Sequence, residues 1–199
     1  MIDLKNKVVL ITGAGKGRGR ILAKAFAERG ASIAANDISP INVEEVVNDI
    51  IKQGGQARAY IEDVAKKLGA QFIIKQVEED FGQIDILINH AAVEPHVPLL
   101  DMDEWDWHRV LDVNLTGVFL MTQSVGRVMR AKGKGTIINL ITATQAPAGN
   151  DAAFVASMSG LDGFTRQAAQ ELSPYGIHVH TVDSDGDQIV EDILALLVE

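Results

Sequence analysis

A short apolar run, VVLI at residues 8–11, leads into the glycine-rich segment TGAGKGRG at residues 12–19. Apolar residues then recur at helical spacing from Ile21 to Phe26, and Gly30 ends this pattern. The segment therefore predicts a strand, a glycine loop and a helix. In such a loop the glycines let the backbone approach a pyrophosphate, and the helix N-terminus directs its unpaired N–H groups at the negative charge. Glycines also serve tight turns, so the segment needs support from its context.

The same alternation of strand and helix continues along the chain. Strand-like runs lie at 32–35, 57–61, 84–89, 136–141 and 177–182. Helical patterns lie between them at 43–53, 65–81, 102–131 and 151–172, and a last one covers 188–198. Strands separated by helices at this rhythm indicate βαβ units. We therefore expect an α/β fold, a doubly wound and mainly parallel six-stranded sheet, in a single domain covering residues 1–199.

The composition excludes several classes of protein. Eighteen Lys and Arg against 27 Asp and Glu give a formal net charge of −9, which argues against nucleic acid or an anionic membrane as a partner. The absence of cysteine excludes disulfides and thiolate metal sites, and no histidine–carboxylate cluster has metal-ligand spacing. No apolar run approaches the roughly 18 residues of a transmembrane helix. The run at 8–11 is also too short for a signal peptide. We expect a soluble cytoplasmic protein without a bound metal.

Asp37 gives the glycine loop its functional context. It stands at the end of the second predicted strand, 18 residues after Gly19 (37 − 19). A carboxylate there can accept hydrogen bonds from the hydroxyls of an adenosine ribose. A solvated aspartate at a strand end would look the same by itself, so the pairing with the loop carries the interpretation. Because Asp37 would repel a 2′-phosphate, it favours NAD over NADP.

Several separated motifs, in order, resemble those of the short-chain dehydrogenase/reductase family. Residues 12–19 match its Thr-Gly-x-x-x-Gly-x-Gly loop, and Asp63-Val64 match the Asp-Val after its third strand. NHAA at 89–92 is similar to its Asn-Asn-Ala-Gly motif. DVNLTG at 112–117 is similar to the helix segment that carries the family's active-site asparagine, here Asn114. The resemblance covers residues 1–182.

The resemblance implies a site for a nicotinamide dinucleotide. The implied cofactor-binding residues are Gly13, Lys16, Gly17, Arg18, Gly19, Asp37, Asp63, Val64, Asn89 and Ala91. Among them Lys16 stands where a basic residue in the family often accompanies NADP, which opposes the effect of Asp37. Arg18 replaces the family's usual apolar residue, and its side chain either reaches a phosphate oxygen or points into water. We expect NAD, with NADP less favoured, and an empty site is a third alternative.

The family's catalytic positions are altered. Its chemistry is a hydride transfer that uses a tyrosine, a lysine four residues later, a serine and an asparagine. Here Phe154 occupies the tyrosine position, Met158 the lysine position and Thr142 the serine position, while Asn114 is unchanged. Phenylalanine has no hydroxyl to donate and methionine has no charge. We therefore expect an NAD(P)-binding protein that is catalytically impaired or inactive.

The alternative is an NAD-dependent oxidoreductase that acts on an alcohol or carbonyl substrate with a modified site. Thr142 and Asn114 would carry it, with help from a water or from a histidine near the end of the fourth strand, His90 or His96. A histidine in a loop is more often simply solvent-facing. Tyr60 and Tyr175 are expected to lie away from the nicotinamide.

The last part of the chain sets an expectation for assembly. A mostly apolar helical stripe favours core or subunit packing, and it consists of Phe154, Met158, Leu161, Thr165, Ala168 and Leu172. After 177–182 the family continues with a Pro-Gly turn, a substrate-covering loop and a seventh strand, whereas this chain enters its last helix directly. We expect the seventh strand to be absent and the sixth strand to form an edge. We also expect a homodimer through helices 115–131 and 151–172, and no tetramer.

Overall fold

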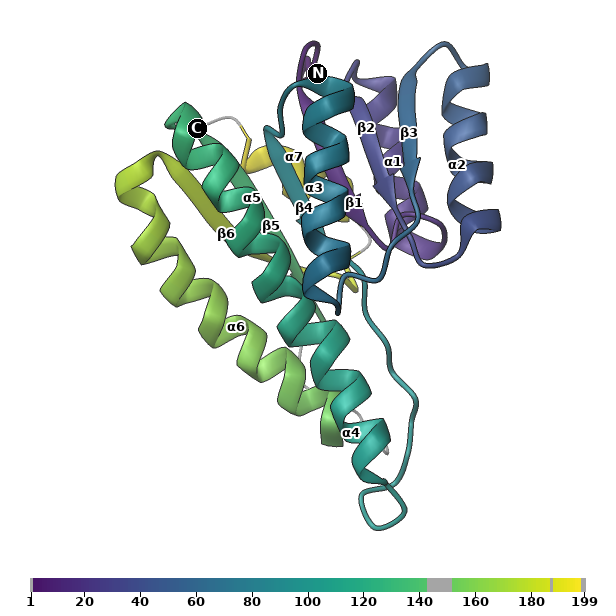
Figure 1. The fold of residues 1–199 in the computed structure, drawn as a ribbon, viewed down its shortest axis with the longest axis vertical. Coiled ribbons are helices and arrows are strands. Elements are labelled where there is room, and N and C mark those ends of the chain that lie inside the picture. The colour runs from purple at the N-terminus through teal and green to yellow at the C-terminus, as the bar shows by residue number, and fades with distance from the viewer. Residues whose placement is uncertain (1, 143–151, 187, 198–199) are drawn as a thin grey trace.

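The computed structural model describes residues 2–142, 152–186 and 188–197 of the chain (Figure 1). Six parallel strands form one sheet in the order β3-β2-β1-β4-β5-β6. The strands are β1 (Val8–Thr12), β2 (Ser32–Asn36), β3 (Gln56–Tyr60), β4 (Ile86–Asn89), β5 (Gly135–Ile141) and β6 (Ile177–Asp183). The expected fold class is confirmed.

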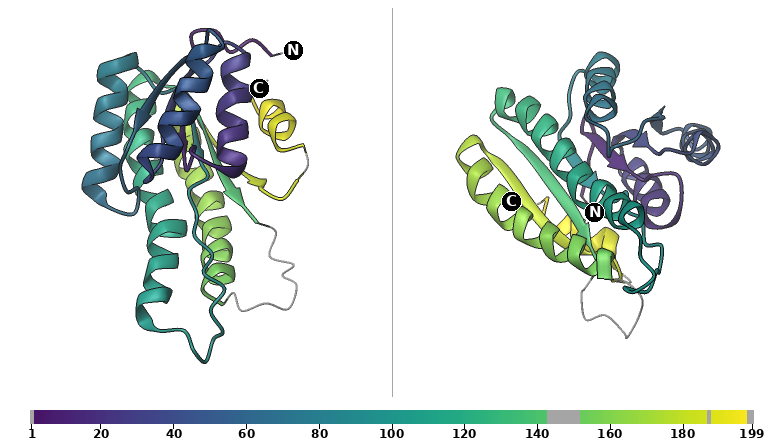
Figure 2. Two further views of the ribbon diagram at one scale, coloured as in Figure 1. Left: turned by 90° about the vertical axis from the view of Figure 1, so that its right-hand side faces the viewer. Right: turned by 60° about the horizontal axis from the view of Figure 1, so that its bottom comes forward.

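Helices connect the strands and cover both faces of the sheet. They are α1 (Gly17–Glu28), α2 (Pro40–Lys52), α3 (Lys67–Phe81), α4 (Glu104–Leu111), α5 (Val118–Lys132), α6 (Ala152–Leu172) and α7 (Ile189–Ala195). A π-helical segment, η1 (Asp112–Gly117), joins α4 to α5, and a 3-10 turn, η2 (Ser173–Tyr175), follows α6. In the left view of Figure 2, α3 and α5 lie on one side of the sheet and α1 and α7 on the other. None of the helices in the described ranges is both long and apolar enough to cross a membrane.

The core lies in two layers separated by the sheet. Alternate residues of β1 point to opposite faces, so Val9 and Ile11 join the cluster beneath α1, α2 and α7. Val8 and Leu10 join the cluster beneath α3, α5 and α6. Every residue of β1 is buried, which explains why this strand is a continuous apolar run and does not alternate.

A third apolar cluster lies beyond the sheet, where α4, α5 and the N-terminal half of α6 meet at the bottom of Figure 1. We call it the α4/α6 cluster. Its buried members are Val110, Val118, Ala153, Phe154, Met158 and Leu161.

The structure divides the helix expected at 102–131. The α-helix ends at Leu111, and the π-helical segment follows before α5 begins at Val118. A π-helical turn accommodates an extra residue, and such bulges are frequent at functional sites. Other limits also shift: α2 begins at Pro40 instead of residue 43, because the fixed φ of proline suits the first turn of a helix.

At one edge of the sheet, β6 has the two-faced pattern expected for an edge strand. Ile177 and Val179 are buried beneath the helices, while His178 on the other face is exposed. The rings of His178 and His180 stack 6.4 Å apart, centroid to centroid.

Candidate dinucleotide site

The glycine loop between β1 and α1 is held close to the end of β4. Gly13 and Gly17 have φ values of 66° and 55°, in the left-handed region that favours glycine. A Cβ atom on Gly13 would lie only 2.9 Å from the Cα of Ala91, so a larger residue would push the loop away from β4. The loop ends at Lys16, whose side chain makes no capping hydrogen bond to α1. The first N–H groups of α1 therefore remain available to an anion.

Asp37 links the glycine loop to the start of α2. Its carboxylate is buried, and Oδ2 accepts a hydrogen bond from the backbone N–H of Gly15 at 2.9 Å. Oδ1 accepts from the N–H of Ser39, also at 2.9 Å. A carboxylate offers about four acceptor positions, so two remain for ribose hydroxyls. A Cβ on Gly15 would lie 2.8 Å from Asp37 Oδ2, which explains the glycine there.

A pocket of about 580 Å³ opens at the carboxyl ends of β1 to β4. Its described lining residues come from the glycine loop, the ends of β2, β3 and β4, α4 and η1. They are Gly13, Lys16, Asn36, Asp37, Ile38, Ser39, Asn42, Glu62, Asp63, Val64, Ala65, Lys66, His90, Ala91, Ala92, Val93, Trp105, Arg109, Asp112 and Val113. Six of the ten residues implied to bind cofactor line this pocket: Gly13, Lys16, Asp37, Asp63, Val64 and Ala91. The sheet edge and the glycine loop thus bring residues far apart in sequence to one cavity.

The side chains of Asn89 and Arg18 are not among the residues that line this pocket, and both have other partners. The Nδ2 of Asn89 donates to Asn139 Oδ1 at 2.8 Å, and the Nδ2 of Asn139 donates to Thr165 Oγ1 at 2.9 Å. This buried network joins β4, β5 and α6. Arg18 Nη1 lies 3.2 Å from Asp185 Oδ1 in a solvent-exposed ion pair, which links α1 to the segment after β6.

His90 holds the glycine loop in place. Its Nδ1 donates a hydrogen bond to the carbonyl oxygen of Gly13 at 3.1 Å, since that oxygen can only accept. The backbone N–H groups of His90 and Ala91 donate to Thr12 Oγ1 at 3.0 and 3.1 Å. Burial lowers the pKa of His90, which favours a neutral ring. His96, in contrast, lies in the exposed loop after β4, with its Nδ1 3.9 Å from Glu94.

The side chain of Asn114 forms hydrogen bonds with the loop after β4. Its Oδ1 accepts from the backbone N–H of Val93 at 2.8 Å, and its Nδ2 donates to the carbonyl of Val93 at 3.0 Å. The same Nδ2 also donates to Ser157 Oγ at 3.1 Å. Asn114 belongs to η1, so the π-helical turn presents this side chain to the loop. Both ends of the carboxamide are occupied.

The other positions aligned with catalytic residues have no acid–base partner in the described ranges. Phe154 and Met158 lie in the α4/α6 cluster, with exposed fractions of 9% and 3%. Thr142 Oγ1 makes a 2.9 Å hydrogen bond with Ser184 Oγ. The stripe that contains Phe154 and Met158 is buried against α4, α5 and the sheet as far as Ala168, so core packing accounts for these residues, while Leu172 is only partly buried.

Neither tyrosine lies among the residues that line the pocket. The hydroxyl of Tyr60 donates to Asp80 Oδ2 at 2.8 Å. Burial and the Asp80 carboxylate raise the pKa of Tyr60 far above its usual value, so this phenol stays protonated. Tyr175 lies at the end of α6, on a different surface.

Trp105 and Arg109 were missed by reasoning from the sequence. The guanidinium of Arg109 lies 5.3 Å from the centroid of the Trp105 ring, and both residues line the pocket from α4. They stand four residues apart and therefore share one helix face. Only Val110 of α4 is buried, and nothing in the sequence of this helix indicates that Trp105 and Arg109 reach the pocket.

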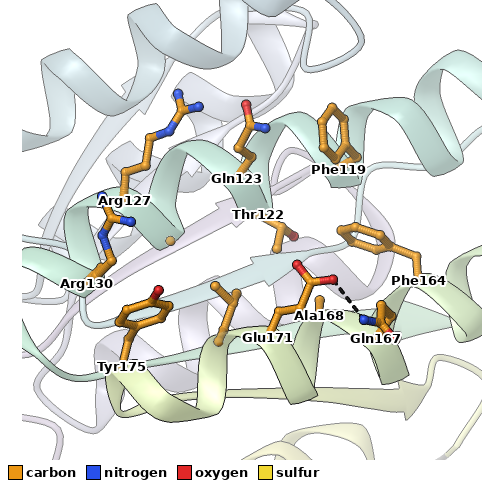
Figure 3. A pocket seen from close by; sticks show the side chains of 12 residues that line it. Phe119, Thr122, Gln123, Arg127, Arg130, Phe164, Gln167, Ala168, Glu171 and Tyr175 are labelled. Atoms are coloured by element: carbon orange, nitrogen blue, oxygen red, sulfur yellow. Dashed lines mark hydrogen bonds between the residues drawn. The ribbon is translucent and has the colours of Figure 1, made fainter.

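A second pocket, of about 340 Å³, lies between α5 and α6 (Figure 3). We call it the α5/α6 groove. The rings of Phe119 and Phe164 meet edge to face near one end, with centroids 6.2 Å apart. Near the other end the guanidinium of Arg130 lies 5.6 Å from the centroid of the Tyr175 ring.

The strand order, the glycine loop and Asp37 together define a dinucleotide-binding α/β protein of the Rossmann type. A family model described as short chain dehydrogenase matches residues 7–185. The chain belongs to this oxidoreductase family, whose fold binds NAD or NADP.

Relatives with stated activities support this assignment. The chain is 38% identical over 185 residues to a 3-oxoacyl-[acyl-carrier-protein] reductase of Synechocystis, covering 92% of this chain and 74% of that protein. It is similar to the crystal structure of NAD⁺-bound xylitol dehydrogenase, with a TM-score of 0.87, 32% identity, and coverage of 92% and 71% of the two chains. It is also similar to a gluconate 5-dehydrogenase from Burkholderia cenocepacia in complex with NADP and tartrate, with a TM-score of 0.85, 32% identity, and coverage of 91% and 71%.

Proposed function

We propose that this chain is a nicotinamide dinucleotide-binding member of its family in which the oxidoreductase activity is lost or strongly impaired. The observation that carries the proposal is the burial of Phe154 and Met158 in the α4/α6 cluster, where the family has its tyrosine and lysine. A bound nicotinamide would supply a hydride-accepting or hydride-donating ring. The substrate oxygen would still need a proton donor, and neither side chain supplies one. General acid–base catalysis contributes roughly 10²–10⁴ in rate, so the loss is large.

The pocket supports binding through groups already in place. The N–H groups at the start of α1 suit the pyrophosphate, and the two free acceptor positions of Asp37 suit the ribose hydroxyls. The carboxylate of Asp63 accepts from the N–H of Ala65 at 2.9 Å and keeps acceptor positions on the pocket wall.

The position of Asp37 also supports NAD as the preferred dinucleotide. A 2′-phosphate would bring a second negative charge beside this buried carboxylate. Lys16, on the same pocket, opposes the preference. Calorimetric titration should show tighter binding of NAD than of NADP, and Asp37→Ala should narrow the difference. Tighter binding of NADP to the unchanged protein would show that Lys16 decides the choice.

The competing function is a working oxidoreductase that uses Thr142 and Asn114. Thr142 keeps a hydroxyl that could contact a substrate oxygen, but a threonine is no proton donor without a base beside it. Asn114 already bonds both backbone groups of Val93. Assays with secondary alcohols plus NAD, and with ketones plus NADH, should show no turnover above background. A sustained, substrate-dependent change in NADH absorbance would establish the competing function instead.

We also propose that two copies associate through the α5/α6 groove. Phe119 and Tyr175 are large, partly exposed rings there, with exposed fractions of 40% and 44%. The groove also carries charges of both signs, from Arg127 and Arg130 on α5 and Glu171 on α6. Under a two-fold axis the same surface meets itself, and these opposite charges can pair across it. A homodimer would cover the exposed rings.

A further inference from the structure

The dinucleotide site has two halves, on either side of the point where the strand order reverses. That point lies between β1 and β4, and dinucleotides bind across the crevice there. The half over β1, β2 and β3 suits the adenosine and pyrophosphate, because it contains the glycine loop and Asp37. The other half lies over the ends of β4 and β5 and is flanked by the start of α6. A complete dinucleotide must place its second ribose and its nicotinamide there.

The first half is polar and equipped for a ligand. Its described lining includes the carboxylates of Asp37 and Asp63 and the amide of Asn42. Lys16 and the first turn of α1 supply positive potential for phosphates. The side wall formed by Trp105 and Arg109 adds planar groups against which a base can stack.

In the second half, most of the described polar side chains already have hydrogen-bond partners, and the buried Oδ1 of Asn89 is the exception. The carboxamide of Asn114 is bonded to the backbone of Val93 and to Ser157, and Thr142 is bonded to Ser184. The adjoining face of α6 presents Phe154 and Met158, which pack with Val110, Val118 and Leu161 in the α4/α6 cluster. Within the described ranges, none of these groups carries a charge, and the hydroxyls of Thr142 and Ser184 keep only one O–H beyond their mutual bond. A ribose placed against Phe154 and Met158 would lose its water without gaining partners there.

We propose that the site recognises an adenosine 5′-diphosphate group and is indifferent to what is attached to its distal phosphate. The inference rests on the proposed dinucleotide site and narrows it to one half. The ligands that fit are ADP and its esters, of which a nicotinamide dinucleotide is one. The chain then responds to adenine nucleotides as a class, and the redox state of a nicotinamide makes no difference to its affinity.

Calorimetry with NADH and with ADP-ribose tests this directly, because the two ligands share the ADP group and the pyrophosphate charge and differ in the nicotinamide. The dissociation constants should agree within about fivefold, and ADP should displace NADH competitively. NADH binding more than about fivefold tighter, or a failure of ADP to compete, would overturn the inference and leave the proposed dinucleotide binding intact. If no ligand of the three binds, both proposals are wrong.

A matched pair of variants locates the binding. Asp37→Ala should weaken the binding of NADH and of ADP-ribose by the same factor, because both ligands present their adenosine ribose to Asp37. Asp49→Ala is the control: this half-buried aspartate of α2 pairs with Lys24 at 2.7 Å and is not among the residues that line the pocket. It should leave both affinities unchanged. A loss confined to NADH in Asp37→Ala would contradict the inference.

Discussion

Met158 is 3% exposed, so a lysine at this position would place a charge among apolar side chains. We predict that Met158→Lys lowers the free energy of unfolding by about 3–5 kcal/mol at neutral pH, because burial depresses the pKa of a lysine by several units. The loss should be greatest at low pH. It should shrink as the pH rises towards the lysine's unfolded pKa, since the unfolded state then also loses its proton.

Urea unfolding at several pH values measures this effect, and Met158→Leu is the volume-conserving control, expected to cost less than about 1.5 kcal/mol. Wild-type stability of Met158→Lys at neutral pH would mean that the ammonium finds polar partners here. The α4/α6 cluster would then still be able to accept the family's lysine.

A second prediction concerns His90 and the dependence of stability on pH. Burial lowers its pKa below the unfolded value of 6.5, so its contribution to stability is complete above that value. The contribution is lost as the pH falls through 6.5 towards the lowered folded pKa, because the unfolded state takes up the proton first. Thermal melts should show that the melting temperature falls less between about pH 7.5 and about pH 5.5 for His90→Asn than for the wild type. A decrease for His90→Asn equal to that of the wild type would refute the prediction.

At the scale of elements, the network from Asn89 through Asn139 to Thr165 fastens β4 and β5 to α6. Thr165→Val keeps the shape of the side chain but leaves the buried Nδ2 of Asn139 without its 2.9 Å acceptor. We expect a loss of about 1–3 kcal/mol in chemical denaturation. Thr122→Val makes the same change at a similarly buried position, where the bond to Asn89 is longer, at 3.4 Å, and Asn89 Nδ2 keeps Asn139. A cost for Thr122→Val equal to or above that for Thr165→Val would argue against this role of the network.

The sequence pattern predicted most elements to within a few residues, because each buried strand is a short apolar run between turn residues. It did not predict the interruption of the long helix at Asp112–Gly117. Within that segment Asn114 bonds the backbone of Val93, which is 21 residues away and belongs to a different segment. The local spacing of apolar residues cannot predict a contact between residues so far apart in sequence. The start of α2 at Pro40, in contrast, could have been predicted, because proline is common at the first position of a helix.

For the candidate site, too, local features could be predicted from the sequence and long-range contacts could not. Residues that act through local backbone geometry, such as Gly13 and Asp37, were identifiable from spacing. The partners of Arg18 and Asn89 were not, because they lie 167 and 50 residues away along the chain. Trp105 reached the pocket only through the packing of α4.

At the scale of the whole molecule, the proposed dimer gives a test that does not depend on nucleotide binding. Phe119→Glu would place a carboxylate on a ring position of the α5/α6 groove, which should abolish self-association because an unpaired charge would be buried. Light scattering should give a dimer mass for the wild type and a monomer mass for this variant. Phe72→Glu is the control, since Phe72 is similarly exposed, at 49%, but lies on α3. A monomeric wild type, or a dimeric Phe119→Glu, would contradict the proposed interface.

The reversal of strand order also has a consequence for biosynthesis. In the finished sheet β1 pairs with β4, with Val9 opposite Ile86, so one edge of this wholly buried, mostly apolar strand has no partner until 77 further residues have been made. A nascent chain that has emerged only as far as α3 would expose that edge, and exposed apolar edges template aggregation. We expect a fragment of residues 1–83 to sediment with the insoluble fraction after expression, and a holdase chaperone to bind it on the ribosome. A soluble, monomeric fragment would show that β1 is protected in another way while β4 is awaited.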